Sequence, residues 1–526
     1  MISDNTPTTL NNIHHNIQFA PQKIWRVSNQ GADTSGWSGW QYRAEGQKSI
    51  QEVLGKADSA GINQVRALGS AWSLSQAANP GAEGWLLQTS DLSYILPTLG
   101  ALAPESPYSN QNLTLLQCGT LVASANLQLG KLERSLLTCG ASNGQTIIGA
   151  SATGTHGAAI NIGSIHDTIA GMHIICSESR HVWIESAEKP LLTPEIASQV
   201  FGNQVEFIRD TSVFNAARVS FGSFGIVESV VLETEPLYLL SVHRKKMKWD
   251  QALQEKVLNL DFDQEPQKDS SLYHVEVTFD PMQLAQGGEF TPWVTTMYKS
   301  VAPAGYQYNA EQKPKNVIVT DPCSVYWGGV AARILPDLML RGAHDLLAKR
   351  FEELDPNTDP KLKPLPLGVL FTDVVMSTQG ASAEIGVDIK DTVSAFDAIA
   401  RAFRKARIAD RPFLGPASMR FVKSSDATLA FTDRGTHTCC IEMPGAATRT
   451  VPQFYQDIRT ELTQANVAFT QHWGQEGDFS ASTVEKSYGS EKVESGKKAR
   501  RQVLNTSALR ARYANAMIIG AGLHET

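Results

Sequence analysis

Short apolar runs alternate with helical patterns through the first half of the chain. Residues 49–60 carry apolar side chains at helical spacing with Gly61 as a stop, and residues 121–137 form a second amphipathic pattern. Further apolar runs predict strands, the last of them closed by Pro236, at 65–68, 85–87, 113–116, 174–176 and 227–232. This mixture indicates an α+β unit rather than a regular βαβ array.

The pattern changes near residue 240, where longer charged helices are expected (343–354) and a proline-rich connector follows (355–366). A chain of 526 residues exceeds what one compact core usually holds. Residues 483–512 are rich in Lys, Arg and Glu and are typical of a solvated helix or tail. We therefore expect an N-terminal extension, two α+β domains and a charged C-terminal tail or helix, at 1–41, 42–240, 241–480 and 481–526.

Composition narrows the class of partner. Hydrophobic residues make up 42% of the chain and charged residues 19%, as in ordinary folded proteins, and the net charge is −7. A general nucleic-acid binder, or a binder of anionic membranes, would need an excess of Lys and Arg. A small-molecule partner is therefore expected, with no nucleic acid and no membrane.

The cysteine pattern and the first 20 residues bear on the cellular compartment of the protein. No apolar stretch approaches the length that spans a bilayer, and residues 1–20 lack the basic start and apolar segment of a secretory signal. The cysteines form no C-x-x-C pair, which disfavours both a disulfide framework and a structural zinc site. We expect a cytoplasmic protein without a metal.

The first candidate site is the run GASNGQTIIGASATGTHGAA at residues 140–159. Because nearly every side chain is small, backbone N–H groups can approach a diphosphate and donate several hydrogen bonds to it. A tight turn with closely packed backbone explains the same composition. The run is neither a G-x-G-x-x-G dinucleotide fingerprint nor a P-loop. Its G-x-S-x-G match at 140–144 lacks the flanking strand and helix that a hydrolase nucleophile needs.

Three segments stand in a specific order along the N-terminal half. They read VRALGSAWS at 65–73, QTIIGASATGTHG at 145–157 and FNAARVSFGSFGIV at 214–227. The first is close to R-x-x-G-x-G-H-S and the last to A-x-x-x-S-x-G-x-x-G-V-V/I. Over residues 42–240 the chain thereby resembles flavoproteins of the vanillyl-alcohol-oxidase type, in particular the sugar-alcohol and aldonolactone oxidase branch. The resemblance implies an α+β fold in which a two-subdomain FAD-binding domain is followed by an α+β substrate domain.

The resemblance also implies which residues hold the FAD. The segment from Gly69 to Ser73 would wrap the flavin and its diphosphate, and Ile226 would meet the adenine side through its backbone. His156 would make a polar contact to the cofactor, or else be a hydrogen-bonded structural histidine. The full set of expected cofactor contacts is Gly69, Ser70, Ala71, Trp72, Ser73, Ala141, Ser142, Thr146, Gly149, Thr153, Gly154, Thr155, His156, Ile226 and His472.

One departure from the family pattern concerns the linkage of the flavin. Many relatives attach it covalently through the histidine of G-x-G-H-S, and here that position is Trp72. An indole ring cannot form that bond, so we expect FAD to be bound non-covalently. Cys139 lies near a region where other relatives use a cysteine tether, but a buried free thiol is the favoured interpretation.

The catalytic residues are sought in the C-terminal half. Relatives in the sugar-alcohol branch carry E-x-R and H-W-G-K there, and this chain has Ser418-Met419-Arg420 and His472-Trp473-Gly474-Gln475. We expect Arg420 to be the electrostatic group and His472 a flavin-proximal polar residue or proton acceptor. Ser418 and Gln475 would meet the substrate, and Glu442 can restore the carboxylate that Ser418 lacks.

The expected function is oxidation of a CH–OH group by hydride transfer to N5 of FAD, on an alcohol, sugar-alcohol or lactone-like substrate. Dioxygen is a candidate electron acceptor, and its access depends on side chains near 140–142. Two alternatives stay open: flavin-dependent oxidative tailoring or cyclisation of a larger natural product, and a flavin-binding protein whose catalytic groups have decayed.

Overall fold

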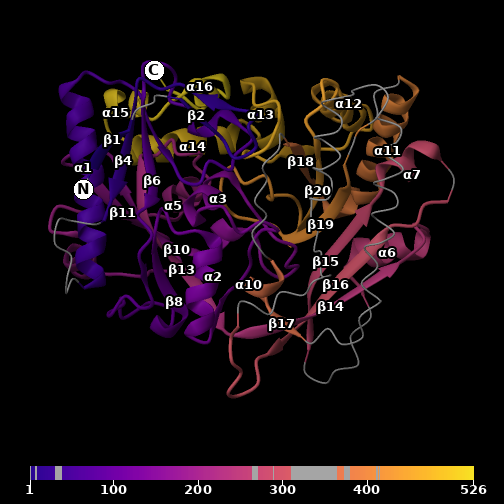
Figure 1. Ribbon diagram of the computed structural model, residues 1–526, viewed down its shortest axis with the longest axis horizontal. Coiled ribbons are helices and arrows are strands. Elements are labelled where there is room, and N and C mark those ends of the chain that lie inside the picture. Colours follow the sequence, from indigo (N-terminus) through magenta and orange to yellow (C-terminus); the bar gives the residue numbers. More distant parts are fainter. Residues whose placement is uncertain are drawn as a thin grey trace.

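The computed structural model describes residues 2–5, 9–29, 38–262, 270–287, 289–309, 364–371, 380–409, 413 and 415–525. Within these residues an N-terminal half is built on a four-stranded and a seven-stranded sheet with a two-stranded hairpin beside them, and a C-terminal half is built on one eight-stranded sheet. The halves lie side by side (Figure 1). The helices expected at 343–354 lie outside the described residues. So does the connector expected at 355–366, except for its last residues, where Leu365–Pro366 form a short strand.

The N-terminal sheet has the strand order β1-β4-β6-β5, in which β4, β6 and β5 run parallel. Its strands are β1 (Ile2–Asn5), β4 (Lys23–Ser28), β5 (Val65–Leu68) and β6 (Trp85–Asp91). Two of these strands come from the residues expected to be an extension, so that segment is part of the sheet. Helix α1 (Gly39–Ser59) begins well before the expected residue 49, because Ser38 and Gln41 form a capping box.

The central sheet has the order β12-β11-β10-β13-β8-β7, with β9 paired to β13. Its strands are β7 (Ile95–Leu96), β8 (Leu113–Gln117), β9 (Arg134–Leu136), β10 (Ile169–Ile175), β11 (His181–Glu185), β12 (Glu206–Arg209) and β13 (Ile226–Pro236). The helices around it are α2 (Val122–Lys131), α3 (Ile147–Thr153), α4 (Pro194–Phe201) and α5 (Thr211–Arg218).

The helix expected over 121–137 is shorter than predicted. It ends at Lys131, and Glu133 adopts a left-handed backbone (φ 56°) that turns the chain. Residues Arg134–Leu136 of the expected helix form β9 instead, which pairs with the end of β13. A few apolar residues at the end of a helical pattern cannot be told from a short buried strand by spacing alone.

The C-terminal sheet has the order β17-β14-β16-β15-β19-β20-β18-β21. Its strands are β14 (Tyr238–Lys246), β15 (Ser271–Phe279), β16 (Trp293–Val301), β17 (Leu365–Pro366), β18 (Gly380–Asp388), β19 (Ala417–Lys423), β20 (His437–Ala446) and β21 (Phe469–Gln471). Helices pack on the outer side of this sheet (Figure 1): α6 (Gln251–Asn259), α7 (Pro281–Gln286), α11 (Thr392–Ile408) and α12 (Val451–Gln464). Its other face turns toward the N-terminal half.

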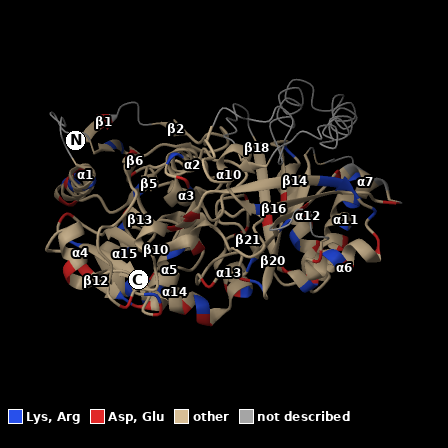
Figure 2. Ribbon diagram, turned by 90° about the horizontal axis from the view of Figure 1, so that it is seen from below, with Lys and Arg blue, Asp and Glu red and all other residues tan. Residues whose placement is uncertain are grey.

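The charged C-terminal residues are not a solvated tail. They form α13 (Ala481–Tyr488), α14 (Ser490–Val503), α15 (Ser507–Arg512) and α16 (Ala516–Gly520), which return to the N-terminal half (Figure 1). Val503 and Tyr513 are buried in the core of that half. Charged residues are frequent along these helices (Figure 2), and most of them are exposed or half-buried, whereas Arg500 and Arg512 are buried. The high charge of the segment concealed its apolar face.

A buried ion pair joins α1 to the central sheet. Arg43 Nη1 lies 3.1 Å from Glu228 Oε2, and both side chains are almost fully buried. The same carboxylate accepts hydrogen bonds from Gln117 (2.9 Å) and Ser229 (2.7 Å) and contacts His173 Nδ1 at 3.0 Å. Burial alone would raise the pKa of Glu228, but Arg43 and His173 lower it to about 2. Its charge is therefore balanced by partners on every side.

We expect Arg43→Ala to lower the free energy of unfolding by about 3–5 kcal/mol, because it leaves the Glu228 carboxylate buried without its cation. Denaturant unfolding followed by tryptophan fluorescence measures this loss. Arg26→Ala is the matched control, since it removes an exposed pair with Asp91 and should cost less than about 1 kcal/mol. Equal losses in the two variants would contradict the assignment.

Candidate active site

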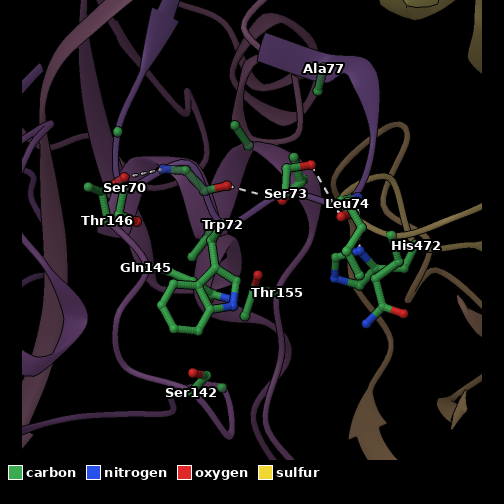
Figure 3. Close-up of a pocket in the computed structure, with 18 of the residues that line it drawn as sticks. Ser70, Trp72, Ser73, Leu74, Ala77, Ser142, Gln145, Thr146, Thr155 and His472 are labelled. Carbon is green, nitrogen blue, oxygen red and sulfur yellow. Dashed lines mark hydrogen bonds between the residues drawn. The ribbon is translucent and has the colours of Figure 1, made fainter. Parts of the chain in front are cut away.

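A cavity of about 300 Å³ lies between the small-residue segments of the N-terminal half and the inner face of the C-terminal sheet (Figure 3). Most of the residues singled out in the sequence line it: Gly69, Ser70, Ala71, Trp72, Ser73, Ala141, Ser142, Thr146, Gly149, Thr153, Thr155, His156, Ser418, Arg420, Glu442, His472 and Gln475. Gly154 and Ile226 do not line it. Gly154 ends α3 in a left-handed conformation, and Ile226 is buried in the core between Gly225 and Val227, which do line the cavity.

The cradle is built on the short helix α3. Thr146 caps this helix and accepts a hydrogen bond from the Gly149 amide at 3.1 Å. A Cβ at Gly69 would stand 2.3 Å from Thr146 Oγ1, so the loop after β5 can approach the helix only with glycine at that position. The first and second sequence segments therefore share one wall of the cavity.

Several polar atoms of that wall are left without protein partners. Ser142 Oγ, Gln145 Oε1 and Gln475 Oε1 are buried and have no hydrogen-bond partner among the described residues. Buried polar groups in native proteins are nearly always hydrogen-bonded, so these atoms fit a bound polar ligand. Close backbone packing together with unpaired polar side chains suits a long cofactor that carries a diphosphate and a polar ring. The residues present therefore fit FAD.

The cofactor loop is tied directly to the C-terminal motif. The amide of Leu74 donates to the Gly474 carbonyl at 2.8 Å, and Ser73 Oγ donates to the same carbonyl at 3.2 Å. A Cβ at Gly474 would stand 2.9 Å from Thr153 Oγ1. Segments separated by some 400 residues in sequence are thus held at the same end of the cavity, where Figure 3 shows His472 beside Leu74.

Pairing register places the polar residues of the C-terminal sheet on one face. Ser418 stands directly opposite Thr278 on one side and Glu442 on the other, and Glu442 stands opposite Glu384. Arg420, two residues along β19, shares that face. The carboxylate that Ser418 lacks is therefore supplied by the neighbouring strand, on the same face and at the same level of the sheet.

The two facing carboxylates share their partners. Gln475 Nε2 donates to Glu442 Oε1 at 3.0 Å and approaches Glu384 Oε2 at 3.3 Å. Arg420 forms an ion pair with Glu442, and its Nη2 lies 3.7 Å from Glu384 Oε1. Like charges opposite each other in a sheet repel, and the guanidinium and the amide offset that repulsion here.

His156 crosses from the cradle to this sheet. Its Nδ1 lies 2.7 Å from the Gly157 carbonyl and its Nε2 lies 2.8 Å from Glu384 Oε1. A carbonyl only accepts, so Nδ1 carries a proton, and the second contact needs a further proton between Nε2 and the carboxylate. Burial raises the pKa of Glu384, but His156 and Arg420 outweigh it and lower that pKa to about 2. One proton is therefore held between the buried imidazole and the carboxylate.

His472 has the opposite character. Burial lowers its pKa to about 4, so the ring is neutral near pH 7. Its Nδ1 accepts a hydrogen bond from the Gly474 amide at 2.9 Å, which leaves the proton on Nε2. Of the two roles expected for His472, this tautomer suits a hydrogen-bond donor rather than a proton acceptor.

Sequence reasoning missed part of the charged cluster. Glu276 on β15 is fully buried with its carboxylate 3.9 Å from Arg420 Nε, and Arg244 on β14 lines the cavity. Glu384, the partner of His156, was also missed. The available signal was a single charged residue inside an otherwise apolar strand, as at Glu276 in the run from Val275 to Val277, since unpaired charges are rarely buried.

The two positions at which relatives attach the flavin covalently, Trp72 and Cys139, differ in where they lie. Trp72 lines the cavity, and its ring packs so closely that a Cβ on Gly144 would come within 2.2 Å of it. Cys139 is a buried free thiol outside the cavity lining, and burial raises its pKa to about 12. A thiol in that state is unreactive.

Comparisons with known proteins bear on the family resemblance. No family model matches the chain. It is 20% identical over 470 residues to L-gulono-1,4-lactone dehydrogenase of Mycobacterium tuberculosis, covering 86% of this chain and 92% of the relative. Over 215 residues it is 24% identical to D-arabinono-1,4-lactone oxidase of Debaryomyces hansenii, covering 39% of this chain and 34% of that one.

Several solved structures share the fold of this protein over nearly the whole chain. Cholesterol oxidase from B. sterolicum superposes with a TM-score of 0.67 at 12% identity, covering 99% of this chain and 97% of that one. 6-Hydroxy-D-nicotine oxidase from Arthrobacter nicotinovorans superposes with a TM-score of 0.55 at 10% identity, covering 98% and 97%. Among the described residues, no helix is both long and apolar enough to cross a bilayer.

These findings confirm the sequence-based expectations of an α+β fold of this type, of FAD as cofactor and of an oxidoreductase acting on CH–OH donors. The likeness in sequence is to the lactone dehydrogenase and oxidase, and the likeness in fold is to the cholesterol and nicotine oxidases. The chain thus has the fold of the vanillyl-alcohol-oxidase type, and its resemblance to the FAD-dependent oxidoreductases of that type is confirmed.

Proposed function

We propose that this protein oxidises a CH–OH group of a small lactone-like, sugar-alcohol or related alcohol substrate, with FAD bound non-covalently. The observation that carries the proposal is the face of the C-terminal sheet that holds Arg420 between Glu442 and Glu384 beside the cofactor cradle. When bound, FAD supplies the hydride acceptor. The remaining requirements, a proton acceptor and a positive group, fall to the protein.

We assign the proton acceptor to Glu442. Its carboxylate is partly accessible from the cavity (19% exposed), while that of Glu384 is closed off by His156. Hydrogen bonds from Gln475 and Ser382 orient it. An ionised carboxylate within reach of a substrate hydroxyl can take its proton as the C–H bond breaks.

Arg420 is assigned to charge stabilisation. Its guanidinium is buried and lies against Glu442, so it can follow the charge that develops on a substrate oxygen during proton removal. His472 Nε2–H adds a neutral hydrogen-bond donor at the same end of the cavity. Gln475 and Ser418 are placed to set which substrate hydroxyl is held, because a buried amide left unpaired penalises a substrate that cannot match it.

The two relatives found by sequence are named for their action on lactones. The altered C-terminal motif bears on whether this protein accepts the same class of substrate. Replacement of the family acid and lysine by Ser418 and Gln475 changes the hydrogen-bonding groups offered to a polyol. The ion pair between the retained Arg420 and Glu442 speaks against a decayed flavin-binding protein. Anaerobic titration with aldonolactones, sugar alcohols and simple alcohols, each followed by flavin bleaching, tests the substrate class. Readmission of air then tests dioxygen as the electron acceptor.

We expect Arg420→Ala to slow anaerobic flavin reduction by about 100- to 1000-fold, because a positive group is lost where charge develops. The dissociation constant of FAD should change little, since Arg420 lies on the sheet rather than in the cradle. Stopped-flow absorbance measures the first and equilibrium dialysis the second. Arg420→Lys, which keeps the charge, should recover part of the rate; equal losses in reduction and FAD binding would contradict the role.

Glu442→Gln should lower the reduction rate by about 100-fold or more and remove the acid limb of its pH profile, since the amide cannot accept a proton. The pH dependence of the reduction rate measures this. Ser382→Ala is the control: it removes one hydrogen bond to the carboxylate and should keep the profile. An unchanged acid limb in Glu442→Gln would show that another group takes the proton.

Acid precipitation of the purified yellow protein should release all the flavin into the supernatant. The expected tether position is Trp72, whose indole lacks the required nucleophilic nitrogen, and Cys139 is buried away from the cavity. Absorbance of pellet and supernatant near the flavin band measures the split. Flavin retained in the washed pellet would contradict non-covalent binding.

A further inference from the structure

The N-terminal hairpin lies against the cofactor loop. Its strands, β2 (Leu10–Asn11) and β3 (Gln18–Phe19), pair with each other. The amide of Ile13 donates to the Ala71 carbonyl at 2.9 Å, and Asn12 Nδ2 donates to the Ser73 carbonyl at 2.9 Å. These bonds hold a loop in which Ala71 has a left-handed backbone (φ 55°). A segment outside the recognised motifs therefore supports one of them.

His14, in the turn of this hairpin, faces the cavity. Its side chain lines the cavity and the residue is only 3% exposed. The ring stands edge-on to Trp72, with centroids 5.8 Å apart and an interplanar angle of 86°. Its Nδ1 is buried and has no hydrogen-bond partner among the described residues. Leaving a buried ring nitrogen unpaired is costly, which points to a partner that arrives with the ligand.

The neighbouring histidine shows that this placement is specific. His15 is exposed and has a left-handed backbone (φ 53°), which directs the chain back toward β3. The oxygen Oδ1 of Asn12 fixes the turn by accepting from the amides of Asn16 and Ile17 at 3.1 Å each. Adjacent histidines are thus presented in different ways, one to the cavity and one to solvent.

Burial lowers the pKa of His14 to about 4 and outweighs an opposite effect of the Trp72 backbone, so the ring is neutral near pH 7. A neutral imidazole has one nitrogen that donates and one that accepts. It can therefore bind a polar group without bringing an unbalanced charge into a cavity that already holds Arg420, Glu442 and Glu384.

We propose that the hairpin of residues 10–19 is part of the FAD site and that a ring nitrogen of His14 hydrogen-bonds to a polar atom of the bound cofactor beside the 69–73 loop. The unpaired, buried Nδ1 and the hydrogen bonds from Asn12 and Ile13 to that loop carry the inference. It rests on FAD as the cofactor and is independent of the substrate and of the roles given to Arg420 and Glu442.

His14→Phe tests the hydrogen bond, because phenylalanine keeps a ring against Trp72 and removes both nitrogens. Equilibrium dialysis of the holoenzyme, with free FAD measured by fluorescence, gives the dissociation constant. We expect it to rise roughly 5- to 50-fold, the range for loss of one hydrogen bond to a polar or charged group. His14→Asn, whose amide offers a donor and an acceptor close to the backbone, should recover affinity to within about threefold of the wild type.

His15→Asn is the matched control, since asparagine tolerates the left-handed backbone and the side chain is exposed. Its FAD dissociation constant should stay within about twofold of the wild type, by the size of typical surface effects. Equal affinity in His14→Phe and His15→Asn overturns the proposal, and so does an equal loss in His14→Phe and His14→Asn. Because no substrate is added, failure of the proposed catalytic roles would leave these results unchanged.

Hydrogen exchange gives a second measurement. It uses the wild-type protein, so misfolding of a variant cannot affect it. Excess FAD should slow amide exchange in a peptide covering residues 9–20, because the cofactor would hold the hairpin on the 69–73 loop. A peptide covering β12 (Glu206–Arg209), at the far edge of the central sheet, should be unaffected. Identical exchange of residues 9–20 with and without FAD contradicts a place for the hairpin in the site.

Discussion

The contact between His156 and Glu384 is the interaction on which the site depends. One residue follows the cradle helix α3, the other lies in strand β18, and their side chains meet at 2.8 Å with almost no solvent access. Because the Gly157 carbonyl fixes the other ring nitrogen, the imidazole cannot turn away from the carboxylate. Together with the hydrogen bond from Leu74 to Gly474, the pair therefore joins the two halves of the molecule at the cavity that lies between them.

The sheet face opposite the cradle shows what burying charge demands. Each carboxylate there has a cation or an amide within reach: Glu276 and Glu442 meet Arg420, while Glu384 meets His156 and Gln475. A buried carboxylate without such partners would cost several kcal/mol or take up a proton. This need for a partner applies to all positions on the shared face of the sheet and not only to those on one strand. A carboxylate on β20, at the position facing Ser418 of β19, can therefore pair with the same arginine.

Local chemistry made part of this structure predictable. The strand at Val65–Leu68 has the predicted bounds, because a compact apolar run bounded by glycines leaves little choice. The small residues around Gly69 and Thr146 pointed to a cradle because close backbone approach leaves a compositional trace. Long-range pairing leaves none: His156 and Glu384 are 228 residues apart, and nothing in either local segment names the other. The burial of Tyr513 could not be predicted either, because the helix before it is rich in charged residues.

The charges of this cluster also bear on the replacement of the family lysine by Gln475. Gln475 cannot carry a charge, yet Arg420 brings one to the same face of the sheet, where it lies against Glu442, Glu384 and Glu276. In the proposed reaction, a proton taken up by Glu442 would remove one negative charge from this face and leave the guanidinium to offset negative charge that develops in the cavity. Proton acceptance and charge stabilisation would then be coupled through one ion pair, and the neutral amide at Gln475 suits that coupling because it orients Glu442 without adding a second fixed cation.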